Sequence, residues 1–193
     1  MNKLFLAIRS ITAPHIFAFL ILTLLYALRP EYFGSVWFLV VGIVTLTILP
    51  LLAYPLQRFI PKFKDKGRAG QRKLAIIFSA LGYLLGSVTV IALGAPTELK
   101  MLFVEYLLCG ISILVSDKVF KFKSSGHACG IVGPVAMLVY LGLYIPAAVA
   151  AVITVPVYIS SIKTKQHTPL QLAVGSIIPI AMLAIDHLIF CIL

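Results

Sequence analysis

The sequence predicts an all-α bundle of transmembrane helices, and its composition and hydropathy pattern support this prediction. Of its 193 residues, 61% are hydrophobic and only 11% are charged, and the mean hydropathy is +1.09. A water-soluble domain has too little interior to bury that much apolar surface, whereas the hydrocarbon core of a bilayer accepts it. Long apolar runs separated by polar or Pro/Gly breaks then predict spanning helices, because helices pair their own backbone polar groups.

Seven apolar segments are the candidates for these helices. In order they are Ile11–Leu28, Val36–Leu56, Leu74–Gly94, Leu99–Ser116, Ala128–Leu143, Pro146–Ser160 and Pro169–Cys191. The fifth and sixth are short and only Tyr144 and Ile145 separate them, so they form either a tight hairpin or one broken helix. No small-residue cleavage site follows the first segment, so we expect it to be retained. The sequence therefore predicts six or seven crossings in one integral-membrane domain, residues 1–193.

The basic residues lie almost entirely on one side of this predicted bundle. With seven spans, the N-terminus and the loops after the second, fourth and sixth helices share a membrane face, which holds all 16 basic residues except Arg29 and Lys100. Because cytoplasmic loops collect lysine and arginine, we expect this face to be cytoplasmic and the C-terminus to lie outside the cell membrane. Alternatively, the cations only bind anionic lipid headgroups and orient the protein. We expect membrane lipids, and no nucleic acid, as partners.

Two loops on the basic face carry a histidine at the entrance of a helix. One reads Lys-Ser-Ser-Gly-His-Ala-Cys-Gly and contains His127, and the other reads Lys-Thr-Lys-Gln-His-Thr-Pro and contains His167. A helix start offers unpaired N–H groups and the positive end of the helix dipole, which favour a bound phosphate. Ser125 and Gly126 would let the backbone approach such an anion closely. Both loops therefore predict a phosphate site.

The residue types in these loops suit phosphate-ester cleavage without a metal. That reaction needs a nucleophile, a proton donor for the leaving oxygen, and cations for the remaining oxygens. Two imidazoles supply the first two, and lysines and arginines from three loops supply the third. The nearby acids, Asp65 and Asp117, are too few for a magnesium or zinc site, so we expect no metal and no cofactor. Cys109, Cys129 and Cys191 lack metal-binding spacing and are expected to be buried as small hydrophobic residues.

Ser124-Ser-Gly-His127 resembles the Pro-Ser-Gly-His signature of the type 2 phosphatidic acid phosphatase superfamily, which also includes vanadium haloperoxidases. The order of the family's last two motifs, their shared membrane side and their two-span gap match this chain over about residues 58–175, in the style of a divergent microbial branch. The resemblance implies that His127 is the general acid and that His167 is a nucleophile that forms a phosphohistidine. It also implies a lipid phosphate or polyprenyl diphosphate as substrate.

The chain departs from the family pattern around the second histidine. Ser161 stands where the third family motif has arginine, six residues before His167, and Gln171 stands where it has aspartate, four residues after. We expect the Gln171 carbonyl to orient the imidazole N–H as part of the catalytic group, although it stabilises the cationic form less. Ser124 replaces the family proline, a mild change. The first motif, Lys-x6-Arg, has no match. The expected phosphate-binding residues are Lys64, Lys66, Arg68, Arg72, Lys123, Ser125, Gly126, Lys163 and Lys165.

The expected function is therefore a metal-independent lipid phosphate or diphosphate phosphatase. Two alternatives stay open, a lipid-binding or transport protein and a lipid phosphoryl transferase. Three further polar residues lie in the predicted spans, where charge is costly and often functional. We expect Asp186 and His187 to form a hydrogen-bonded structural pair, and Glu105 to pair with a neighbour or line a cavity. The sequence does not indicate an oligomeric state.

Overall fold

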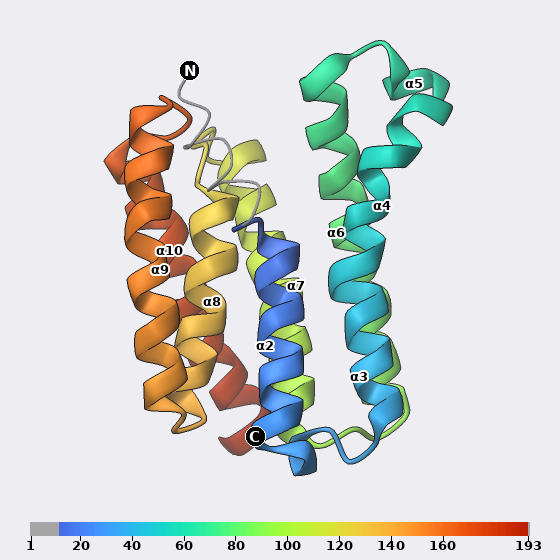
Figure 1. Cartoon of the computed structure of the whole chain (residues 1–193), viewed down its shortest axis with the longest axis vertical. Coiled ribbons are helices and arrows are strands. Elements are labelled where there is room, and N and C mark those ends of the chain that lie inside the picture. Colours follow the sequence, from blue (N-terminus) through green and yellow to red (C-terminus); the bar gives the residue numbers. More distant parts are fainter. Residues whose placement is uncertain (1–11, 193) are drawn as a thin grey trace. The chain divides into compact units, whose positions relative to one another are not determined.

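The computed structural model describes residues 12–192, apart from the side chain of Arg68 (Figure 1). The chain is 84% helical and the described residues contain no strand, so the all-α prediction is confirmed. Residues 1–11, which include Lys3, Arg9 and the start of the first predicted span, lie outside the described residues.

The helices follow the apolar segments of the sequence. They are α2 (Pro14–Leu28), η1 (Pro30–Tyr32), α3 (Val36–Gly42), η2 (Ile43–Ile48), α4 (Leu49–Leu56), η3 (Gln57–Phe59), α5 (Pro61–Lys64), α6 (Gly67–Ala92), α7 (Thr97–Lys118), α8 (Gly126–Tyr140), α9 (Tyr144–Lys163), α10 (Pro169–His187) and η4 (Leu188–Ile192). Here η1 and η3 are 3-10 turns, while η2 and η4 are π-helical. The fifth and sixth predicted segments are the separate helices α8 and α9, so the hairpin interpretation is confirmed.

Several of these helices suit a bilayer. Among the described residues, five stretches are long and apolar enough to cross a membrane: Val36–Phe59, Ala69–Ala92, Thr97–Lys118, Tyr144–Lys163 and Pro169–Ile192. The shorter apolar helices α2 and α8 complete the set of seven predicted segments. Length and composition therefore indicate an integral membrane protein.

The chain packs as two compact units, and the divisions between them fall inside α2 and α7. Met1–Phe17 and Val104–Leu193 form one unit, here called the histidine unit because it holds His127 and His167. Ala18–Phe103 form the other, here called the hairpin unit. The expectation of a single domain over the whole chain stays a prediction.

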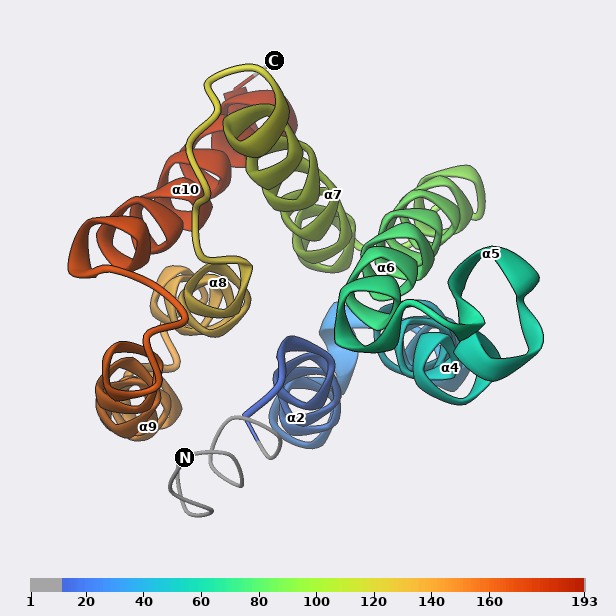
Figure 2. The ribbon, with the colours of Figure 1, turned by 90° about the horizontal axis from the view of Figure 1, so that it is seen from above.

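In the histidine unit, α8 packs against both α9 and α10 (Figure 2). Phe17, Ile131 and Val157 form a buried cluster that joins the start of α2 to α8 and α9, and Tyr158 packs against it. The Tyr158 hydroxyl also hydrogen-bonds to Ser176, which ties α9 to α10. These contacts connect α8 and α10, which carry the two histidine loops, through α9.

In the hairpin unit, α6 approaches η2 closely because it presents two glycines one turn apart. A Cβ atom at Gly82 would lie 2.1 Å from the Thr45 carbonyl oxygen, and one at Gly86 would lie 2.7 Å from Thr45 Oγ1 and 2.4 Å from the ring of Phe103 on α7. Small residues at positions i and i+4 let helix backbones meet in a bilayer, where packing drives association in place of the hydrophobic effect.

We expect Gly82→Leu to destabilise the protein by about 1–3 kcal/mol, because the added side chain overlaps the Thr45 backbone. Ala80→Leu is the matched control, since Ala80 is exposed on the same helix. Thermal unfolding of the purified proteins in detergent, followed by circular dichroism, compares them. Equal midpoints for the two variants would show that the contact between η2 and α6 is not tight.

Candidate functional site

The two predicted histidine loops lie at the same end of the histidine unit. One links α7 to α8 and the other links α9 to α10, and Figure 2 looks down on both. Each loop runs directly into the first turn of a helix, and its histidine lies at that helix start. His127 is in the first turn of α8, and His167 precedes the N-cap of α10, which is Thr168.

The backbone of Ser125 joins the loop before α8 to the first turn of α10. Its N–H donates to the carbonyl oxygen of Gln171 over 3.1 Å, while its own carbonyl oxygen accepts from Cys129 N–H. Gly175, one turn after Gln171, lies directly beneath, because a Cβ there would be 2.4 Å from the Ser125 oxygen. Without a side chain at that position, α10 presses directly on the loop before α8. The segments that carry His127 and His167 are therefore neighbours.

The hydroxyl of Ser125 has a structural role. It accepts a hydrogen bond from Ala128 N–H at 3.2 Å and so caps α8, and the residue is fully buried. This differs from the predicted contact between the Ser125 side chain and phosphate, because a buried capping hydroxyl is not presented to a ligand. Gly126, by contrast, is exposed with open space where a Cβ would stand. Its N–H belongs to the first helical turn, where the helix supplies no partner.

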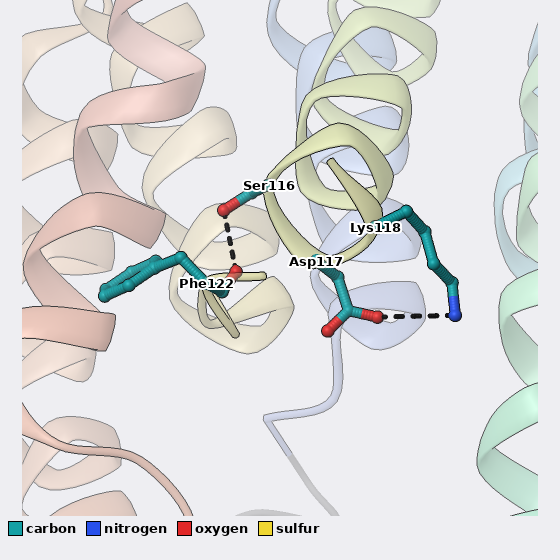
Figure 3. A network of polar contacts seen from close by, with 4 residues as sticks. All are labelled: Ser116, Asp117, Lys118 and Phe122. Atoms are coloured by element: carbon teal, nitrogen blue, oxygen red, sulfur yellow. Dashed lines mark hydrogen bonds and ion pairs between the residues drawn. The ribbon is translucent and has the colours of Figure 1, made fainter. Parts of the chain in front are cut away.

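Ser116 at the end of α7 anchors the loop on its other side. Its hydroxyl donates to the Phe122 carbonyl oxygen over 2.8 Å (Figure 3) and lies 2.6 Å from the Ser124 hydroxyl. Ser124, which replaces the family proline, is buried and held by this contact. Next to it, Asp117 pairs with Lys118 at 3.8 Å, so the Lys118 charge is locally balanced (Figure 3). Sequence analysis did not identify Ser116, because a serine in an apolar helix carries no distinguishing pattern.

Gln171 sets the tautomer of His167. Its Oε1 accepts from the backbone N–H of Thr168 at 3.1 Å and lies 3.2 Å from His167 Nδ1. Because a backbone N–H can only donate, the atom facing both groups is an acceptor, and Nδ1 must carry the proton that it receives. The lone pair of the neutral ring is then on Nε2. The Gln171 N–H completes a capping box by donating to Thr168 Oγ1 over 3.3 Å.

His127 is held by the segment that leads into α2. Its Nε2 lies 3.3 Å from Thr12 Oγ1, and both groups are at least partly buried. One turn further along α8, a Cβ at Gly130 would lie 2.6 Å from Pro14, so the start of α2 rests directly on α8. Sequence analysis missed Thr12, and no local signal could have revealed it, because 115 positions separate it from His127.

The expected cations of the histidine unit are exposed around these loops. Lys123, Lys163 and Lys165 are all exposed, whereas Ser161, at the position of the family arginine, is fully buried and uncharged. Lys165 and Lys121 have positive φ angles of 52° and 54°, a conformation that favours glycine. A left-handed lysine costs about 1–2 kcal/mol of backbone strain.

The other expected phosphate-binding residues belong to the hairpin unit. Lys64 ends α5, Lys66 is the N-cap residue of α6, and Arg72 lies in its second turn; all three are exposed. Gln57 shapes this turn, because its Nε2 donates to the carbonyl oxygens of Phe63 and Gly67. The side chain of Arg68 lies outside the described residues. Their role as phosphate clamps stays a prediction.

The described part of the chain contains no group of three or more His, Cys, Asp or Glu residues that could hold a metal ion. Cys109 and Cys129 are buried, as predicted, whereas Cys191 is exposed, which corrects its prediction. Cys191 lies in η4, close to the end of the last span. Comparison with family models, curated proteins and solved structures gives no match to this chain.

We expect Gly175→Ala to lower the thermal midpoint and Gly126→Ala to leave it unchanged or slightly higher. Both changes add one methyl group to α8 or α10, but only the first meets a backbone oxygen, 2.4 Å away. The expected cost at Gly175 is about 1–3 kcal/mol, as for other overpacked sites. Circular dichroism melts of the two purified variants measure it. If Gly175→Ala has the same thermal midpoint as the wild type, the contact between Gly175 and the Ser125 carbonyl oxygen is not as close as described.

Proposed function

We propose that this chain is a membrane-embedded phosphatase of lipid phosphates that acts through a phosphohistidine on His167. One observation supports the proposal most directly. The Ser125–Gln171 backbone hydrogen bond joins the loop before α8 to the first turn of α10, between the positions of the two histidines, at an end of the bundle with several exposed lysines. The resemblance of these loops to the type 2 phosphatidic acid phosphatase motifs suggests the role of each histidine.

In the first step, His167 Nε2 attacks phosphorus. The tautomer set by Gln171 supports this role, because it leaves the Nε2 lone pair available. As the N–P bond forms, phosphorus loses its bond to the leaving oxygen, which is the lipid oxygen of a monophosphate or the bridging oxygen of a diphosphate, and His127 as imidazolium donates its proton to that oxygen. The products are a lipid alcohol, or a lipid monophosphate from a diphosphate, and phosphorylated His167.

In the second step, water attacks the phosphohistidine. Neutral His127 takes a proton from the water, the N–P bond breaks, and inorganic phosphate leaves with both histidines restored. Thr12 is a positioning residue in both steps, because its hydroxyl lies within hydrogen-bond distance of His127 Nε2. The Gly126 N–H, Lys123, Lys163 and Lys165 would stabilise the charged phosphate oxygens.

An apolar groove supports a substrate with a lipid chain. It lies between α7 and α10, has a volume of about 350 Å³, and is lined by residues that include Ser112, Ser116 and Val174. Ser116 also contacts Ser124 in the loop before α8. A chain lying in this groove would therefore end close to the histidine loops. We assign the basic face to the cytoplasmic side, on the lysine and arginine bias of its loops.

The central test uses the purified protein with phosphatidate and with a polyprenyl diphosphate, in the presence of a metal chelator. We expect release of inorganic phosphate and inhibition by vanadate. His127→Ala and His167→Ala should each reduce the rate by at least about 10³-fold, the scale of losing a catalytic group. His187→Gln is the matched control, since His187 bonds to Tyr140 at 2.8 Å, at the other end of α8, and should retain activity.

Other outcomes of this experiment separate the alternatives. Unchanged turnover in both alanine variants would refute the proposal. A phosphohistidine that forms on His167 without phosphate release would indicate a phosphoryl transferase. Lipid phosphate binding with no covalent species would indicate a lipid-binding or transport protein. The uncharged, buried Ser161 at the position of the family arginine would then explain the absence of catalysis.

We expect Gln171→Glu to remain active and Gln171→Leu to lose about 10- to 100-fold in kcat, the scale seen when the partner that orients a histidine is removed. Glutamate preserves the capping box and holds the Nδ1 proton, whereas leucine does neither. Gln166→Leu is the matched control, because Gln166 is exposed in the same loop. A Gln171→Leu variant as active as Gln166→Leu would show that Gln171 does not orient His167.

A further inference from the structure

Two acidic side chains are buried inside the histidine unit, away from the histidine loops. Glu105 on α7 is 2% exposed and Asp186 on α10 is 0% exposed. None of their four carboxyl oxygens has a hydrogen-bond partner within the described part of the chain. Both residues lie in stretches long and apolar enough to cross a membrane. An ionisable group at such a depth is costly and often marks a functional site.

The two carboxyl groups belong to one neighbourhood. Asp186 of α10 and Cys129 of α8 both lie within electrostatic range of Glu105. Cys109, one turn after Glu105 on α7, is in hydrogen-bonding contact with Cys129. Among the described residues, the ionisable groups near the Glu105 carboxyl group are thus one further acid and two thiols, and none of them is a cation.

Gly133 makes room for the Glu105 carboxyl group. A Cβ atom at Gly133 would lie 3.3 Å from Glu105 Oε1 and 3.5 Å from the Pro179 Cβ. The Glu105 carboxyl group therefore lies where α7, α8 and α10 meet, beside a position with no side chain. Gly133 is seven residues into α8, which corresponds to about 10 Å along the helix from its start.

The physical chemistry of this pair favours a bound proton. An unpaired carboxylate in an apolar interior is strongly unfavourable, and two carboxylates within electrostatic range of each other also repel. Because no described cation is near Glu105, the two groups are neutral only when both carboxyl groups carry protons. Unlike most buried acids, these have no hydrogen-bond partner between residues 12 and 192 that would fix those protons in place.

At the end of α10, an exposed histidine directly follows the buried Asp186 in the chain. The expectation of a hydrogen-bonded Asp186–His187 pair is wrong, because Asp186 points inward without a partner while His187 is exposed and lies 2.8 Å from the Tyr140 hydroxyl. The π-helical η4 begins directly after His187. Such π-helical turns often occur at functional sites. A titratable imidazole at the surface thus directly follows a buried carboxyl group in the chain.

We propose that Glu105 and Asp186 form an intramembrane proton-binding site that exchanges protons with solvent through the end of α10 at His187. Each exchange converts a carboxylic acid to a carboxylate and a released proton, and no other bond changes. The site is separate from the histidine loops and does not depend on the proposed phosphatase function.

The test follows the carboxyl groups of the purified wild-type protein by infrared spectroscopy as pH is raised, in H2O and in D2O. We expect a band from protonated carboxylic acid that shifts in D2O and declines at high pH. Glu105→Gln and Asp186→Asn should each remove part of it, while Asp117→Asn, which changes an exposed acid, should leave it unaltered. His187→Gln should slow the deuterium shift several-fold without changing the band in H2O.

A second probe is dicyclohexylcarbodiimide, an apolar reagent that modifies protonated carboxyl groups within membranes. We expect mass spectrometry to locate the adduct on Glu105 or Asp186, with less labelling as pH rises. Because both measurements use the wild type, they decide the matter even if a variant does not fold. A band that neither shifts in D2O nor changes with pH would overturn the proposal, since the acids would then be sealed structural groups. Protection from labelling by sodium ions at constant pH would also overturn it, in favour of a cation site.

Discussion

The histidine unit depends on the contact between the backbone of Ser125 and the first two turns of α10. The Ser125 N–H is paired with the Gln171 carbonyl oxygen, its hydroxyl caps α8, and its carbonyl oxygen rests against Gly175. In a bilayer, a loop that enters a bundle must have its polar backbone groups paired inside the protein. This single residue satisfies that requirement and also brings the loop of His127 beside the loop of His167.

The same contact explains the local sequence Ser-Gly-His in structural terms. The serine is buried because it caps and anchors, the glycine is exposed with open space around it, and the histidine lies between these extremes. Each of the three residues thus suits its environment at the start of α8: Ser125 is buried, Gly126 is exposed and His127 is half-buried. The departures at the second histidine are also local. Gln171 keeps its capping and orienting contacts, while Ser161 brings no charge.

Most of the fold could be predicted from the sequence. Hydropathy indicates which segments are buried in the bilayer, and prolines and glycines indicate where the helices begin and end. The pairing of the loops was also predictable, since helices of alternating direction return to the same end. What the sequence could not show is which faces meet. Thr12 meets His127 across 115 positions, and Glu105 meets α8 only because Gly133 has no side chain. Hydropathy carries no information on such contacts. Asp186 and His187 failed as a pair because successive helical residues point about 100° apart.

Lys121 and Lys165 give the two loops a shared property. Each holds a cationic side chain on a left-handed backbone, at a position where glycine would fold with less strain. Proteins that are selected only for stability tend to lose such residues, whereas sites that handle ligands keep them. Engineering this protein for heat resistance would therefore target these two positions first. Each gain in melting temperature there would remove a positive charge from the end of the histidine unit at which the two histidine loops lie.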